Sequence, residues 1–469
     1  MRVPFLPLLV GIALSTSATP PPLRSIGAGP EVRARQAPRM SSLDNGVIRI
    51  GVDLEMGGVI TYLSRSSDSR NVINVHDFGR EVQQSYYSGP TPFGVSHPAF
   101  PNWSWNPIGA GDIYANPSRV VASSNDGTTI YVRAIPMQWA LDQVPGECFF
   151  ETWITLDGNA ASLRYRLTNH REDLARYRPF SQELPAVFTI GKLYRAFTYD
   201  GPAPFTDGPI RELPFVPGHW RTYRPTENWM ALVDGSGWGL GVFSEEVYRF
   251  VAGFWGEPDT GGPEDDPTGY MAPAREEILD HNITYNYSAS LILGTLSEIR
   301  AYAVAHRRAE SRPDHHFALD HFQEDRQHFV YVNAEDGGLP IRGGLRVNLD
   351  RPNPQILLPE SRWEADALPI LYVTAAFRTH DASATISWAM PGEGFTETRR
   401  VSFTVVPDGV LRTYVVSLAG APGYTGTIAR LRLDPGEGGI PGDSVTIASI
   451  SFRPPDASPR TPRIVARPN

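Results

Sequence analysis

The sequence predicts an all-β protein in which a large antiparallel β-supersandwich is followed by a smaller jelly-roll β-sandwich. The chain of 469 residues contains 43 glycines and 43 prolines, which interrupt it too often for long helices. Short segments with alternating apolar and polar residues recur along its length, as in strands that have one buried face. Turn-forming pairs such as Asp157-Gly158 separate neighbouring segments and are typical of hairpins.

The N-terminus has the order of an export signal. Arg2 is followed by an apolar stretch at residues 3–14 and by small residues up to Ala18. The stretch is too short to cross a bilayer, so we expect cleavage of a signal peptide, residues 1–18, and no membrane partner. The protein is therefore expected to be secreted, periplasmic or extracellular, with residues 19–40 as a Pro/Arg-rich spacer.

The large sandwich is expected at residues 41–305, where alternating segments follow one another closely. These segments are 47–52, 59–63, 129–132, 149–156, 161–167, 229–233, 239–243 and 285–293.

The smaller sandwich is expected at residues 328–455, after a charged connector with a short helix at residues 306–327. Its alternating segments are 329–332, 370–376, 384–388, 400–405, 412–418, 428–433 and 445–452. The polar residues 456–469 are expected to form a disordered tail.

Charge and cysteine content exclude several functions. Lys and Arg total 42 and Asp and Glu total 51, which gives a net charge of −9, so nucleic acid is not an expected partner. Cys148 is the only cysteine, which excludes an intrachain disulfide and a cysteine zinc site. No pattern in the sequence predicts an oligomeric state.

A polar cluster lies at residues 71–87 and includes Asp77, Arg80, Gln83 and Tyr86. Such a mixture of carboxylate, guanidinium, amide and phenol groups suits a polyhydroxylated ligand, which needs many donors and acceptors and an aromatic face. The alternative is a loop that an Asp–Arg ion pair holds together.

Two tryptophans, Trp103 and Trp105, lie in a loop rich in Gly, Pro and Asn. Large apolar faces are costly in water, so these side chains are expected to stack under a sugar ring. The alternative is a small core beneath a long loop.

Two glutamates are candidates for acid–base chemistry. Glu183 lies among Leu, Pro and Phe residues, an environment that raises a carboxyl pKa. Glu227 precedes an expected strand that begins at Trp229, and His219 and Trp220 lie shortly before it. Two carboxyls from different strands are what glycoside cleavage needs, one to protonate the leaving oxygen and one to activate water or attack. A structural role as a cap or an ion pair is the alternative for each.

No cofactor and no metal are expected, although calcium is possible at the acidic loop of residues 257–266. This loop lacks the spaced pattern of a calcium loop, so a solvated loop is the favoured interpretation.

The beginning of the first body resembles galactose-mutarotase-like β-sandwich domains, and the resemblance would cover residues 41–305. It rests on Gly57-Gly58-Val59-Ile60-Thr61, Asn74, Asp77, Gly79-Arg80 and Gln83. Asn169-His170 is similar to one histidine motif of aldose epimerases, which implies a catalytic role for His170. The first histidine motif is not found, and this departure argues against simple sugar epimerisation. The second body resembles jelly-roll carbohydrate-binding modules through Trp363, Trp388, Tyr414, residues 431–435 and Gly442.

These features together predict a secreted carbohydrate-active enzyme with a carbohydrate substrate. The leading interpretation is a glycoside hydrolase that cleaves a poly- or oligosaccharide with a carboxylate pair, Glu183 and Glu227. A polysaccharide lyase with Tyr86 or His170 as base and Arg80 beside a uronate is a second interpretation. A non-catalytic glycan-binding protein is the third.

Overall fold

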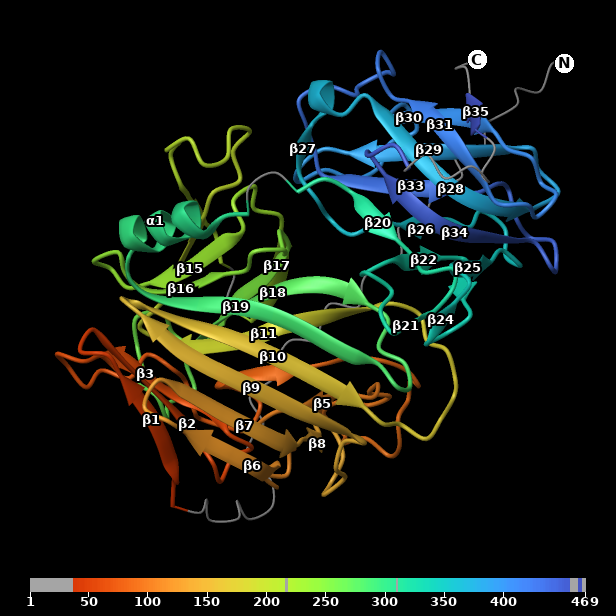
Figure 1. The fold of residues 1–469 in the computed structure, drawn as a ribbon. Helices are drawn as coiled ribbons and strands as arrows, with labels where there is room; N and C mark the ends of the chain where they lie inside the picture. The colour runs from red at the N-terminus through yellow and green to blue at the C-terminus, as the bar shows by residue number, and fades with distance from the viewer. Residues whose placement is uncertain (1–36, 216–217, 309–310, 456–462, 466–469) are drawn as a thin grey trace, which may run out of the picture.

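The computed structural model describes residues 37–215, 218–308, 311–455 and 463–465. Figure 1 shows two β-rich bodies, and nearly all of their strands pair antiparallel, as the sequence predicts. The predicted export signal and most of the predicted spacer lie outside the described residues. Within the described ranges, no helix is long and apolar enough to cross a membrane.

The first body consists of two large sheets that pack face to face. One is ten-stranded: β1 (Met40–Asp44), β2 (Ile48–Asp53), β3 (Val59–Arg65), β4 (Val82–Ser85), β11 (Phe180–Ile190), β18 (Thr268–Glu277), β17 (Phe250–Trp255) and β14 (His219–Tyr223), with β5 (Pro107–Ile108) and β8 (Met137–Gln138) beside β4. The other is nine-stranded: β13 (Arg211–Leu213), β12 (Arg195–Thr198), β15 (Trp229–Val233), β16 (Trp238–Phe243), β19 (Thr284–Thr295), β10 (Ala160–Asn169), β9 (Cys148–Asp157), β7 (Thr129–Ile135) and β6 (Arg119–Asn125). The main hydrophobic core fills the space between the sheets.

The period-two pattern of the sequence sets which residues enter this core. In β10, Leu163, Tyr165 and Leu167 are buried, and the arginine at position 164 between them is exposed. The turn between β9 and β10 is the predicted hairpin, in which Asp157 pairs with Ala160. Gly158 takes a positive φ of 53° there, a conformation that glycine adopts without a steric penalty.

One α-helix, α1 (Leu296–His306), follows β19 directly among the described residues. Thr295 and Glu298 form a capping box at its start, in which each side chain bonds the backbone N–H of the other residue. The sequence predicted a short helix within the connector of residues 306–327. The structure instead has the helix before this connector.

The second body also contains two main sheets. One is seven-stranded: β23 (Glu335–Asp336), β25 (Leu345–Asn348), β34 (Ser444–Ser451), β28 (Ile370–Arg378), β31 (Arg412–Ser417) and β35 (Arg463–Val465), with β20 (Asp314–His316) beside β34. The other is five-stranded: β22 (Val330–Val332), β26 (Gln355–Leu357), β33 (Arg430–Asp434), β29 (Ser383–Ala389) and β30 (Arg400–Thr404). Two short pairs complete it, β21 (Phe322–Gln323) with β24 (Ile341–Arg342) and β27 (Trp363–Glu364) with β32 (Thr427–Ile428), and the short helix η1 (Ala365–Ala367) follows β27. The jelly-roll order of these strands stays a prediction.

The structure corrects two predicted boundaries of the second body. The connector contributes strands, because β20 pairs with β34 and β21 pairs with β24. Of the predicted tail, the structure describes residues 463–465, and these form β35, which pairs in parallel with β31. Segments of two or three residues are too short for their alternation to predict a strand. These short strands therefore form through tertiary pairing.

The aromatic residues that suggested a carbohydrate-binding module belong to the core of the second body. Trp363, Trp388 and Tyr414 expose at most 1% of their surface and pack in one hydrophobic cluster. Trp363 donates to the hydroxyl of Tyr424 at 3.0 Å, and Trp388 donates to the carbonyl of Gly423 at 3.0 Å. These side chains are not available to stack on a sugar, so they do not support that resemblance.

Candidate functional site

A groove opens on the face of the ten-stranded sheet that is turned away from the main core. Along β18, Met271 points into the main core, whereas Tyr270 and Ala272 belong to a separate small cluster on the opposite face. Side chains of β4, β11, β14 and β18 form the floor of the groove, and the loops around Trp103 and Trp139 form its wall. The groove holds about 560 Å³, counted with its open mouth. We call it the Glu183 groove, after the one carboxyl residue among the described residues that line it.

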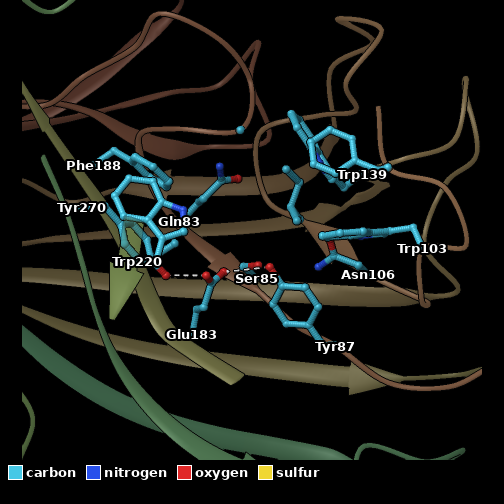
Figure 2. Close-up of a pocket in the computed structure, with 14 residues that line it drawn as sticks. Gln83, Ser85, Tyr87, Trp103, Asn106, Trp139, Glu183, Phe188, Trp220 and Tyr270 are labelled. Carbon is cyan, nitrogen blue, oxygen red and sulfur yellow. Dashed lines mark hydrogen bonds between the residues drawn. The ribbon is translucent and has the colours of Figure 1, made fainter. Parts of the chain in front are cut away.

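Glu183 lies on the floor between two tyrosines, as Figure 2 shows. The Tyr87 hydroxyl donates to Oε2 of Glu183 at 3.3 Å, and the Tyr270 hydroxyl donates to Oε1. Ser85 is the direct cross-strand partner of Glu183 on β4, and its hydroxyl favours the ionised carboxyl. Hydroxyl groups from the two strands that flank β11 and from the loop after β4 thus surround one carboxyl group.

Burial controls the protonation of these groups. It raises the pKa of Glu183, and the hydrogen bonds from Ser85, Tyr270 and Tyr87 oppose this effect only in part. Burial and the charge of Glu183 raise the pKa of Tyr87 and of Tyr270 well above the usual range. Both phenols therefore stay protonated at neutral pH and act as hydrogen-bond donors to the carboxyl.

Aromatic rings form the walls of the groove. Trp103 is half-buried and lies 5.0 Å from Phe100, and Phe100 lies 5.9 Å from Trp139, both edge to face. On the opposite side, Trp220 lies 5.1 Å from Tyr270. Rings of this size present flat apolar faces on both sides of the carboxyl.

Glycine at position 253 permits the placement of Trp220. A Cβ atom at Gly253 on β17 would lie 1.9 Å from the Trp220 ring, far inside van der Waals contact. It would also lie 2.6 Å from the main-chain carbonyl oxygen of His219, so any larger residue would displace the main chain of β14 together with the indole.

Two buried amides, which also line the groove, form hydrogen bonds with its walls. Gln83 donates to the carbonyls of Phe78 and Arg80 at 3.2 and 2.6 Å and accepts from the Ala110 amide at 2.7 Å. Asn106 accepts from the indole N–H of Trp103 at 3.0 Å. These bonds fix the loops that carry the aromatic rings.

Of the predicted site residues, the structure brings Glu183, Gln83, Trp103 and Trp220 to one groove. The others lie elsewhere in the first body.

Glu227 is a structural residue of the other sheet. It is fully buried directly before β15 and forms an ion pair with Arg300 of α1 at 2.7 Å. Trp229, also fully buried, donates its indole N–H to the same carboxyl at 2.8 Å. The structure therefore corrects the pairing of Glu183 with Glu227, and it places Trp229 in a core cluster rather than in a sugar site.

Tyr86 and Trp105 are core residues, because both are fully buried. The Tyr86 hydroxyl donates to Gln84 at 2.8 Å, and Trp105 packs against the guanidinium of Arg171 at 4.9 Å. Of the two predicted tryptophans, Trp103 lines the groove and Trp105 does not; Tyr87, the neighbour of Tyr86, lines the groove as well.

Arg80 and Asp77 form an ion pair that holds the polar loop together, which is the alternative to a ligand-binding role. The Arg80 side chain is 4% exposed and pairs with Asp77 at 3.2 Å and with Asp266 at 2.8 Å. Asp266 belongs to the acidic loop, so this loop is tied by an ion pair. Within the described parts of the chain, no three Asp, Glu, His or Cys residues are grouped to hold a metal ion, which gives the calcium interpretation no support.

The two predicted histidines, His170 and His219, are both exposed and outside the groove lining. The His170 ring contacts Phe149 at 5.7 Å. His219 precedes Trp220 on β14, and neighbouring strand residues point to opposite faces, so His219 points away from the groove.

No family model matches this sequence, and no curated protein matches it. Among solved structures it is similar to a galactose mutarotase related enzyme from Lactobacillus acidophilus, with 9% identity and a TM-score of 0.36 over 54% of this chain and 97% of that chain. It is similar to a galactose mutarotase-like protein from Lactobacillus casei, with 11% identity and a TM-score of 0.32 over 54% and 100%. It is also similar to an alpha-galactosidase from Lactobacillus brevis, with 9% identity and a TM-score of 0.35 over 60% and 44%. At these TM-scores the similarities establish no family.

Proposed function

We propose that this protein is a carbohydrate-active enzyme in which Glu183 moves a proton to or from a sugar bound in the Glu183 groove. The observation that carries the proposal is the carboxyl of Glu183, with its raised pKa, between two phenol donors on the floor of an aromatic groove. A general acid or base works best when its pKa lies near the working pH.

The aromatic walls support a sugar as the ligand. A pyranose has apolar C–H faces and a rim of hydroxyls, so it stacks on indole rings while its rim forms hydrogen bonds. Trp103 and Trp220 flank the carboxyl from two sides and supply such faces. Tyr87 and Tyr270 would donate to the sugar once Glu183 has accepted a proton.

The groove favours chemistry with one carboxyl. Hydrolysis by the usual mechanism needs two carboxyls about 5–10 Å apart, and Glu183 is the only carboxyl residue among the described residues that line the groove. We therefore favour a reaction in which a single group transfers the proton, such as elimination or isomerisation, over hydrolysis by a Glu183–Glu227 pair.

Incubation with a panel of polysaccharides tests this proposal, with reducing ends and unsaturated sugar ends as the two measured quantities. Elimination produces unsaturated sugar ends without adding water, isomerisation changes the sugar without cleaving it, and hydrolysis produces reducing ends alone. We expect turnover that Glu183→Gln abolishes, with unsaturated or isomerised product. Reducing ends without unsaturation, formed equally by Glu183→Gln, would contradict it.

A further inference from the structure

A second pocket lies between the two bodies, next to the Glu183 groove on the strands β11 and β18. Arg224, which follows β14, and Arg249, which precedes β17, line it from the first body, together with Glu276 of β18. Glu360 and Arg430 of β33 line it from the second body. In Figure 1 the end of β18 points toward the second body beside β22. We call this site the interface pocket.

The carboxylates of the interface pocket each have an arginine partner. Glu276 pairs with Arg249 at 3.4 Å, Glu360 pairs with Arg362 at 3.5 Å, and Glu246 pairs with Arg308 at 2.7 Å. Arg249 also donates to Ser181 at 2.8 Å.

Two arginines of the interface pocket have no carboxylate within 4.0 Å among the described residues, namely Arg224 and Arg430. Arg224 is exposed, and Arg430 donates to the main-chain carbonyl of Glu393 and lies over Phe395. Burial, with repulsion from Arg224 and Arg249, lowers the pKa of Arg430, although Glu360 opposes this shift. The pocket thus gathers positive charge that the surrounding protein only partly neutralises.

The interface pocket and the Glu183 groove share one face of the sheet. On β18, Tyr270 lines the groove, Ala274 and Glu276 line the interface pocket, and alternate residues of a strand point the same way. Ala274 is the direct cross-strand partner of Glu183, so the interface pocket begins on the strand next to the carboxyl. Glu276 lies two residues further along β18, which is roughly 7 Å at about 3.3 Å per residue. Ser181, the partner of Arg249, is two residues from Glu183 on β11. Both sites can therefore contact one extended chain.

We propose that the interface pocket binds an anionic group, a carboxylate or a sulfate, on the same carbohydrate chain whose ring enters the Glu183 groove. The substrate class is then an acidic polysaccharide. Arginine suits this role because its planar guanidinium forms paired, charge-assisted hydrogen bonds with oxyanions. This inference rests on the proposed function, and it names the substrate of that site.

Binding of three defined polymers tests it: polygalacturonate for carboxylate, dextran sulfate for sulfate, and dextran as the neutral polymer. Affinity electrophoresis at low salt measures binding to the full chain. We expect one or both anionic polymers to bind, and Arg224→Gln and the double variant R224Q/R430Q to weaken that binding by at least about tenfold. The control R119Q/R346Q removes the same charge from exposed arginines elsewhere and should change affinity less than twofold.

Thermal unfolding of every variant checks that the fold is kept. If R430Q is unstable, the single variant R224Q is used for the binding test, since Arg224 is exposed. Anionic polymers that bind R224Q as tightly as the wild type, or that fail to bind the wild type, would overturn the inference. So would an equal loss in R119Q/R346Q, which would indicate a general charge effect. Turnover that depends on Glu183 but not on Arg224 would leave the proposed function in place and reject only the interface pocket.

Discussion

Substitution of Glu227, whose carboxyl is buried, tests whether this glutamate is structural or catalytic. Its two oxygens accept from Arg300 at 2.7 and 3.0 Å, from the Phe205 amide at 2.7 Å and from the Trp229 indole at 2.8 Å. Glu227→Gln keeps the shape but leaves the Arg300 guanidinium, which is 12% exposed, without its charge partner.

The magnitude follows from this geometry. Breaking a buried ion pair from one side costs about 3–5 kcal/mol of unfolding free energy. At about 2–4 °C per kcal/mol for a body of this size, the melting temperature should fall by roughly 6–20 °C. Turnover per folded molecule should not change, because Glu227 does not line the Glu183 groove.

Calorimetry and turnover on the same samples measure both effects. Glu212→Gln is the matched control, since Glu212 pairs with Arg195 at 2.7 Å but is 47% exposed, and an exposed pair is worth at most about 1 kcal/mol. A Glu227→Gln protein that keeps its melting temperature and loses turnover would refute this reasoning and restore Glu227 to the chemistry.

Two further predictions concern the junction of the bodies and the wall of the groove. Glu277 is buried, which by itself raises its pKa, but His328 and Arg275 outweigh burial and lower the pKa to about 2. A depressed carboxyl pKa stabilises the fold above the unfolded value near 4.5, and this stability, of the order of 3 kcal/mol, is lost as pH falls toward 2. Urea unfolding from pH 6 to pH 2 should therefore show a flatter acid limb in Glu277→Gln, and an unchanged limb would contradict this. Gly253→Ala should displace Trp220 together with the main chain at His219 and weaken sugar binding in calorimetric titration, with thermal unfolding to measure the cost to the fold. Unchanged sugar affinity would show that Trp220 does not contact the sugar.

The all-β class could be predicted from the sequence because strand periodicity is local. The hairpin at Asp157-Gly158 and alternating strands such as β10 appear where their own residues indicate them. Pairing between distant segments leaves no such signal, so the short strands β20 and β35 were not predicted.

The site was only partly predictable, for a physical reason that Tyr86 and Tyr87 illustrate. Neighbouring strand residues point to opposite faces, so a choice of the wrong neighbour replaces a groove residue with a core residue. Tyr86 enters the core, while Tyr87 reaches Glu183. Tyr87 is two residues from Ser85, the cross-strand partner of Glu183, so strand alternation indicates that both point to the same face. The sequence alone does not show, however, that β4 pairs with β11. Tyr270 lies 87 positions from Glu183 and gave no local sign.

Turnover by Glu183→Gln, measured with the melting temperature on the same samples, shows whether Glu183 transfers the proton. The amide keeps the size of the carboxyl and removes its proton transfer, which typically costs about 10²–10⁴ in rate. We expect turnover to fall by this factor while the melting temperature is unchanged or higher. The melting temperature does not fall because a buried carboxyl with a raised pKa disfavours the folded state above that pKa. Full turnover in Glu183→Gln would contradict it.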